Sequence, residues 1–268
     1  MLPVEPQGAG SDRHYGHLLS GPPAYRPHTP WPPLMAVAAT LLILMVSMVA
    51  AVTAAEWVGG AGQGGDIVAS AGLPLAASLV GSQTAAVLLT LLAARAFGGQ
   101  PRAVLALGPP AGGLSVYLGA FALMVALTSA FTLAVWMLDP ETVAGDLAPF
   151  TGLLRSPFWW LALLAIGVGA PLMEELIFRG FLFSALAQSR LGMPGASLVT
   201  SAAWTVLHAS YSLAGLAEVF AIGLFFAWVV WRTGSARVTI FCHGAYNTAV
   251  ALLLMTGAFP SPAGAGTG

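Results

Sequence analysis

The chain has very little charge. Only 7% of its 268 residues are Asp, Glu, Lys or Arg, whereas a soluble globular domain carries about 25%. Lysine is absent, and the nine arginines nearly balance the acids to a net charge of −1, which gives no basis for binding nucleic acid. A single cysteine, Cys242, excludes an internal disulfide framework. With 57% hydrophobic residues, the composition predicts an all-α, polytopic membrane protein.

Three familiar hydrolase signatures are also missing. The sequence contains no Gly-x-Ser-x-Gly, no His-Glu-x-x-His and no paired intramembrane aspartates. The usual residues of a nucleophile-elbow serine hydrolase, a zincin or an intramembrane aspartyl protease are therefore not available. No internal repeat is apparent either.

The apolar residues gather in stretches that are long enough, or nearly so, to cross about 30 Å of hydrocarbon. They predict a transmembrane bundle of about seven helices. The fourth stretch is too long for one perpendicular span, so we expect it to tilt, to bend near Gly167–Pro171 or to extend into the cytosol. The fifth is short. The stretches are 34–57, 75–97, 112–138, 157–188, 197–212, 215–232 and 238–257.

Composition divides the chain into four parts. Residues 1–33 form a Pro-rich polar leader, and residues 258–268 form a tail rich in Gly, Ala and Pro. Both lack the apolar content to build a core, so we expect them to be disordered. Between them, residues 34–138 hold three helices without a recognisable motif, and residues 157–257 hold four helices that carry the single cluster of intramembrane charges.

Arginine placement predicts the orientation, because Lys and Arg are retained on the cytoplasmic side of a membrane. The leader and alternate loops contain arginine, and the opposite loops contain mainly acids. We therefore expect a multi-pass protein of a bacterial plasma membrane, with a cytoplasmic N-terminus and an external C-terminus. The arginines on the predicted cytoplasmic side are Arg13, Arg26, Arg95, Arg102, Arg190, Arg232 and Arg237.

The most informative residues are Glu174, Glu175 and Arg179, three charges within an otherwise apolar helix. Each charge near the bilayer centre costs roughly 2.5–3.5 kcal/mol on insertion scales, so their presence favours a chemical role. Glu175 and Arg179 are four residues apart and share a helix face, which predicts an ion pair. Glu174 points about 100° away and is free to act as a base. The alternative is a purely structural ion pair that locks helices together.

Two further constellations follow on later helices. Trp204 and His208 are four residues apart in the fifth stretch, and His243 and Asn247 have the same spacing in the last one. Taken singly, either histidine serves equally well as an interhelical hydrogen-bond donor or as a catalyst. Together with Glu174 they supply a base, a proton shuttle and oxyanion donors for acyl hydrolysis by water. We expect Glu174, His208, His243 and Asn247 to converge on one polar cavity that opens toward the cytoplasmic half of the membrane.

The order Glu-Glu-x-x-x-Arg-Gly, aromatic-x-x-x-His and His-x-x-x-Asn on successive apolar helices resembles the CAAX protease and bacteriocin-processing family. This family is also called Abi or type II CAAX prenyl endopeptidase, and its members are intramembrane proteases. The resemblance covers residues 157–257 and implies that this part is a four-helix catalytic core. It places Trp204 where the family more often has Phe, which makes the wall facing the substrate bulkier.

The resemblance implies a glutamate-dependent mechanism. In it, Glu174 and His208 activate water, Arg179 and Glu175 support the site, and His243 with Asn247 stabilises the oxyanion. We expect Trp204 and Phe178 to contact the substrate, a peptide or lipidated peptide or protein at the cytoplasmic leaflet of the lipid membrane.

Members of the family have been described both as metalloproteases and as metal-free enzymes. We expect no cofactor here, because the motifs lack the short ligand spacing of a His-Glu-x-x-His helix. If a zinc ion is bound, Glu174, His208 and His243 are the ligands to expect.

Two other functions remain open from the sequence. A transporter or receptor-like binding protein would use buried Glu, Arg and His as a proton relay. The lack of an inverted repeat, and the confinement of the charges to four helices, speak against it. A catalytically silent member of the same family would act as a scaffold or immunity factor, but all six motif residues are present.

Overall fold

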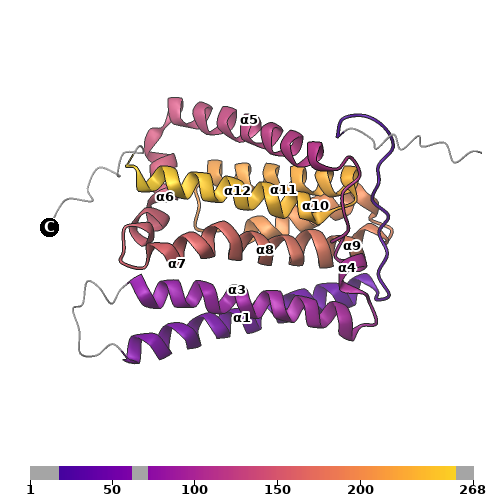
Figure 1. Cartoon of the computed structure of the whole chain (residues 1–268), viewed down its shortest axis with the longest axis horizontal. Coiled ribbons are helices and arrows are strands. Elements are labelled where there is room, and N and C mark those ends of the chain that lie inside the picture. The colour runs from indigo at the N-terminus through magenta and orange to yellow at the C-terminus, as the bar shows by residue number, and fades with distance from the viewer. Residues whose placement is uncertain (1–17, 62–71, 258–268) are drawn as a thin grey trace, which may run out of the picture.

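The computed structural model describes residues 18–61 and 72–257, and every regular element within these ranges is a helix (Figure 1). The all-α class predicted from composition is confirmed. Residues 1–17 of the expected disordered leader, and the expected flexible tail at 258–268, lie outside the described residues.

Six helical segments are long and apolar enough to cross a membrane. A further helix, α10 (Gly192–Val206), has 15 residues, fewer than the ~20 that span a bilayer. With α10 counted as a partial span, the expected number of about seven is met. The described chain accordingly begins and ends at opposite ends of the bundle (Figure 1). The six long segments are α1 (Pro33–Ala61), α3 (Gly72–Ala96), α5 (Leu114–Leu138), Trp159–Ala187, α11 (Leu213–Thr233) and α12 (Ala236–Met255).

One end of the bundle holds most of the described arginines and is called here the arginine end. Backbone hydrogen bonds join its loops: the N–H of Ala24 donates to Arg232 O at 3.2 Å, and the N–H of Ala236 donates to Ala106 O at 2.8 Å. The short helix α4 (Pro101–Val104) lies at this end, and α6 (Pro140–Leu154) lies at the other (Figure 1). The arginines at or next to helix boundaries of the arginine end are Arg95, Arg102, Arg190, Arg232 and Arg237, and Arg26 lies in the segment before α1 that is hydrogen-bonded to the end of α11.

The helix α6 corrects the sequence analysis, which treated this region as a loop. Asp139 caps it by accepting hydrogen bonds from the backbone N–H groups of Glu141 and Thr142, and Pro140 occupies the first helical position, where its missing N–H costs nothing. The hydrogen bond from the Thr142 hydroxyl holds the pKa of Asp139 below its ordinary value. Asp139-Pro140 is therefore a helix-start signal in the sequence, although the helix that follows is too short to span the membrane.

The leader is also ordered where the structure describes it, contrary to the disorder expected over residues 1–33. Trp31 is 2% exposed, and its ring stacks on Phe181 with centroids 5.0 Å apart. The buried Tyr25 donates a 2.6 Å hydrogen bond to Ser184 Oγ, because the single Ser184 hydroxyl hydrogen goes to Val104 O. Residues 18–32 thus pack at the arginine end against the later part of the long segment Trp159–Ala187, which carries Phe181 and Ser184.

The fifth predicted stretch, 197–212, has different boundaries in the structure. The helix α10 begins at Gly192 and ends at Val206, and residues 207–212 form the turn that leads into α11. His208 therefore lies just beyond a helix end rather than within a helix. Gly223 on α11 permits the two helices to approach closely, since a Cβ there would come within 2.8 Å of Ser201.

The long helical segment Trp159–Ala187 changes its hydrogen-bonding pattern twice. It runs through α7 (Trp159–Leu164), a π-helical turn η1 (Ala165–Gly169), α8 (Ala170–Glu174), a second π-helical stretch η2 (Glu175–Leu182) and α9 (Phe183–Ala187). The irregularity at η1 falls where the sequence analysis expected a bend. π-Helical turns are frequent at functional sites, and here they bracket Glu174 and contain Glu175 and Arg179.

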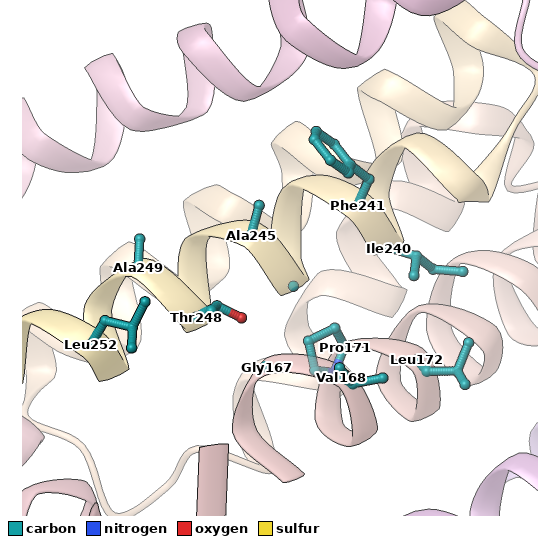
Figure 2. Close-up of a pocket in the computed structure, with 11 residues that line it drawn as sticks. Gly167, Val168, Pro171, Leu172, Ile240, Phe241, Ala245, Thr248, Ala249 and Leu252 are labelled. Carbon is teal, nitrogen blue, oxygen red and sulfur yellow. The ribbon is translucent and has the colours of Figure 1, made fainter. Parts of the chain in front are cut away.

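The helix α12 lies close against η1 and α8 because small residues face each other. A Cβ on Gly244 would come within 2.8 Å of Gly167 O, and one on Gly167 would come within 2.3 Å of Thr248 Oγ1. Figure 2 shows Thr248 pointing toward the helix that carries Gly167, along an open apolar groove of about 610 Å³ between the two helices. This close approach sets the distance from α12 to the residues on α8 and η2.

Candidate active site

Three parts of the chain bring the predicted site residues together. The end of α8 and the following η2 carry Glu174, Glu175 and Arg179. The last turn of α10 carries Trp204, and α12 carries His243 and Asn247. All these side chains lie in the middle of the bundle, between the arginine end and the end that holds α6.

Glu175 and Arg179 form the ion pair that their spacing predicted. Arg179 Nη1 lies 3.3 Å from Glu175 Oε1, and both side chains are fully buried. None of the three guanidinium nitrogens makes a hydrogen bond with a described residue. Arg179 is thus held by charge, with Glu175 as the nearest carboxylate and Glu174 as the second one that acts on it.

Glu175 also contacts His243. The distance from His243 Nδ1 to Glu175 Oε1 is 3.2 Å, so Nδ1–H donates to the carboxylate that Arg179 holds ionised. This fixes the orientation of the imidazole and leaves Nε2 as the ring nitrogen available to other groups. His243 Nε2 lies 3.9 Å from Glu174 Oε2.

Glu174 is bound by an indole rather than by an arginine. Trp204 Nε1–H donates to Glu174 Oε2 at 2.5 Å, and both side chains are buried. The sequence analysis assigned Trp204 to the substrate-facing wall. Its hydrogen bond to Glu174 shows that it also fixes the carboxylate.

The same indole ring stacks on Arg179. The guanidinium carbon is 4.2 Å from the centroid of the Trp204 ring and 5.3 Å from that of Phe226, which are favourable cation–π distances. Glu174, Glu175, Arg179, Trp204 and His243 therefore form a closed circuit of contacts, which we call the charged cluster. Because each member touches two others, moving one side chain displaces its neighbours.

His208 lies next to the charged cluster without an ion-pair contact to Glu174 among the described residues. Its Nδ1–H donates to the backbone carbonyl of Trp204 at 3.1 Å, and its ring is 5.2 Å from the Trp204 ring. Because Nδ1 is occupied by the carbonyl, Nε2 is the nitrogen left for proton transfer.

Asn247 donates a hydrogen bond to a backbone carbonyl that the π-helical turn leaves without an N–H partner. In a π-helix each carbonyl pairs with the N–H five residues later. The residue five positions after Ile166 is Pro171, which has no N–H. Asn247 Nδ2 donates to Ile166 O at 3.1 Å, and the second hydrogen on Nδ2 stays available.

A cavity of about 470 Å³ connects these residues. Glu174, His208, His243 and Asn247 all line it, as the motif spacing predicted, whereas Glu175 and Arg179 lie behind it. Phe178 was expected to contact substrate, but its side chain is 1% exposed, packs in the hydrophobic core and does not line the cavity. That expectation was wrong because η2 turns Phe178 into the bundle.

The cavity also contains polar residues that the sequence analysis did not single out. Asp146 on α6 and Glu218 on α11 line it together with Gln83 on α3. Glu218 was visible as an acid within an apolar stretch, which marks a candidate functional residue. Asp146 and Gln83 gave no such signal, because one was placed in a loop and the other lies in a helix without a motif.

The cavity extends from Glu174 toward the end of the bundle that holds α6. Its lining includes residues of α6, the second half of α12 and the turn after α10, where Ser210 is exposed. This is opposite to the arginine end (Figure 1). The predicted cytoplasmic position of the arginines and the predicted cytoplasmic opening of the cavity are therefore incompatible.

Comparison with protein families adds an independent observation. Residues 156–249 match the family described as type II CAAX prenyl endopeptidase Rce1-like. This part of the chain is Rce1-like. The match contains all six motif residues and Trp204, so the resemblance inferred from the motifs is confirmed. The family is one of intramembrane CAAX-type proteases, and the chain is a multi-pass integral membrane protein. No curated protein and no solved structure matches it.

The zinc ligands that the resemblance implied as an alternative do not form a compact set. Among residues 18–61 and 72–257, no three His, Cys, Asp or Glu side chains are grouped closely enough to hold a metal ion. The Trp204 N–H points at Glu174 Oε2, and His208 Nδ1 is committed to a backbone carbonyl. The Nδ1 hydrogen bonds of His208 and His243 leave both Nε2 atoms free, as in many zinc sites, so binding of zinc by Glu174, His208 and His243 would require these three side chains to move closer together.

Proposed function

We propose that the chain is an intramembrane endopeptidase that hydrolyses a peptide bond of a membrane-associated peptide, lipidated or not, with Glu174 as the general base. The observation that carries this proposal is the position of Glu174, buried in a Rce1-like segment, facing a cavity and next to His243. A base held at such a site can activate a water molecule against a carbonyl carbon.

In the proposed reaction, Glu174, assisted by His208 Nε2, accepts a proton from water. The water oxygen forms a bond to the carbonyl carbon, and the carbonyl oxygen becomes an oxyanion. The second N–H of Asn247 Nδ2 donates to this oxyanion. His243 donates to it through Nε2–H when the ring is an imidazolium, which carries a proton on each nitrogen and keeps Nδ1–H on Glu175. The C–N bond then breaks, and the proton held by Glu174 passes to the leaving nitrogen. The products are a carboxylic acid and an amine.

The test is cleavage of candidate membrane peptides by the purified protein in lipid nanodiscs, with Glu174→Ala as the matched control. We expect two peptide products from the unaltered protein and none from Glu174→Ala. Failure of the unaltered protein on a broad set of membrane peptides would contradict the proposal and favour the binding or scaffold role.

Trp204→Phe separates the hydrogen bond to Glu174 from the stacking on Arg179. The phenyl ring keeps a face for the guanidinium but removes the N–H that binds Glu174 Oε2. A hydrogen bond to a charged group is worth about 1.5–3 kcal/mol, so we expect turnover to fall about 10- to 100-fold with little change in KM. Full activity in Trp204→Phe, measured as kcat and KM on one peptide, would show that the indole N–H does not position the base.

We propose that the reaction needs no metal ion, supported by the spacing of Glu174, His208 and His243, which are not grouped closely enough among the described residues to hold one. Activity should then survive dialysis against a strong chelator at its full level. Loss of activity on chelation, followed by recovery when zinc is added back, would instead identify His208 and His243 as ligands.

We also propose, from the arginine asymmetry, that the N-terminus is cytoplasmic and the C-terminus external. A reporter fused after Gly268 should then give an external signal, and the cavity, which extends away from the arginine end, would receive substrate from the outer side. A cytoplasmic signal from the same fusion would reverse the orientation and place the opening at the cytoplasmic leaflet.

A further inference from the structure

The cavity holds more carboxyl groups than hydrolysis requires. Its lining includes three carboxyl groups, those of Glu174, Asp146 and Glu218, and neither arginine nor lysine is among the described residues that line it. Of these three residues, only Glu174 belongs to the motifs that carry the proposed hydrolysis. The other two carboxyl groups therefore call for a separate explanation.

Glu218 lies within the membrane span of α11 and lacks a cationic partner among the described residues. Thr132 Oγ1 donates a 3.1 Å hydrogen bond to Glu218 Oε1, which is the contact that α5 supplies. Glu175 offers the comparison, since it is fully buried and paired with Arg179 at 3.3 Å, whereas Glu218 is half-buried and faces the cavity. Carboxylates inside a membrane bundle are usually paired, and the cavity leaves room for the pairing cation to come from a ligand.

Asp146 on α6 supplies a second carboxyl group to the cavity wall. It accepts hydrogen bonds from Ser212 N–H and from Ser212 Oγ–H, both at 2.7 Å, and so fixes the turn after α10 to α6. Gly215 leaves space for it, because a Cβ there would come within 2.4 Å of Asp146 Oδ2. Burial, followed by the charges of Glu174, Asp146 and Glu218, raises the pKa of Tyr211, so all three carboxyl groups act on one phenol at the cavity wall.

An unpartnered amide also faces this space. Gln83 is 7% exposed, lines the cavity and has no hydrogen-bond partner among the described residues. Gly169 leaves the room it occupies, since a Cβ there would come within 1.9 Å of Gln83 Oε1. A carboxamide offers both a donor and an acceptor, which matches the backbone of a peptide. A polar group that lines a cavity without a partner is available to a ligand there.

We infer that Glu218, with Asp146, forms a cation-binding subsite, so that the substrate is a peptide carrying a basic side chain or a free amino group near the bond that is cut. This inference rests on the proposed function for the site, and it names the class of peptide that the site takes. The peptide cation supplies the positive charge that the chain does not place next to Glu218. The Gln83 carboxamide binds the backbone of the same segment.

The test measures binding and cleavage separately. The probes are fluorescent ten-residue peptides that differ at one position, where they carry either arginine or its neutral isostere citrulline, and this position is moved along the sequence in turn. Binding is measured on Glu174→Gln protein in nanodiscs of uncharged lipid, so that neither turnover nor lipid charge contributes. At one or two positions we expect the arginine peptide to bind about tenfold or more tightly than its citrulline partner, with a preference that weakens as salt is added.

Adding Glu218→Gln, which keeps the side-chain shape, should bring the ratio of the two affinities close to one. The matched control is Glu141→Gln, because Glu141 is an exposed acid on α6 that does not line the cavity, and it should leave the ratio unchanged. Equal affinity for both peptides at every position, or an unchanged ratio in Glu218→Gln, would overturn the inference. A preference for arginine without any cleavage by protein with Glu174 intact would uphold the inference and contradict the proposed hydrolysis.

Discussion

Glu174→Gln should reduce peptide cleavage by about 10²–10⁴-fold while the protein stays folded. The amide cannot accept a proton from water, and general-base catalysis contributes a factor of this size. Its oxygen still accepts the hydrogen bond from Trp204 Nε1, so the contact that holds the side chain is retained. The measurement is the initial rate on one peptide, together with thermal unfolding in the same detergent.

Substrate binding provides the control for this variant. Because Glu174→Gln keeps the cavity, it should bind the peptide with unchanged affinity. Cleavage by Glu174→Gln at the normal rate would show that Glu174 is not the base. Loss of peptide binding together with a lower unfolding temperature would show that the substitution damages the structure.

Glu175→Gln should act in a different way and lower stability together with activity. It leaves the guanidinium of Arg179, which is fully buried, without a negative charge at 3.3 Å. Breaking a buried ion pair from one side typically costs ~3–5 kcal/mol, because an uncompensated charge stays in the interior. We therefore expect a clear fall in the unfolding temperature, and a loss of cleavage because His243 loses the carboxylate that orients it.

The double variant Glu175→Leu, Arg179→Met is the matched control for the charge. Removing both members of a buried pair is often neutral for stability, so it should unfold at a higher temperature than Glu175→Gln alone. It should remain inactive. If Glu175→Gln is stable but inactive while Glu174→Gln is active, then Glu175 is the base and Glu174 has the supporting role.

Helical periodicity was sufficient to predict the contacts within one helix and the convergence of the motifs. The Glu175–Arg179 pair follows from a spacing of four residues, and it survives in a π-helical stretch. Convergence of Glu174, His243 and Asn247 on one cavity follows from their placement on neighbouring apolar helices. These inferences needed only the direction in which each side chain leaves its helix.

Contacts between distant segments could not be predicted in this way. The hydrogen bond from Trp204 to Glu174 joins residues 30 positions apart, and spacing within α10 does not indicate which way the indole turns. Tyr25 and Ser184 are 159 positions apart, so no local pattern indicates their contact. The Pro-rich leader was therefore expected to be disordered, although its described part packs on the core helices. The π-helical turns have no clear sequence signal, and they turn Phe178 into the core instead of the cavity.

The direction in which the cavity opens illustrates the same limit. Arginine counting concerns the loops, whereas the opening depends on α6, a helix of 15 residues that is too short to span the membrane. The two predictions therefore drew on separate features of the chain. Only the packing of α6 against the bundle shows that they refer to opposite ends.

The most direct test of the central claim is mass spectrometry of the products formed in water enriched in ¹⁸O, with the unaltered protein and Glu174→Gln side by side. Hydrolysis by activated water predicts two fragments from the unaltered protein, the N-terminal one with a single ¹⁸O in its new carboxyl group, and no fragments from Glu174→Gln. Fragments without ¹⁸O, or equal cleavage by both proteins, would contradict the account.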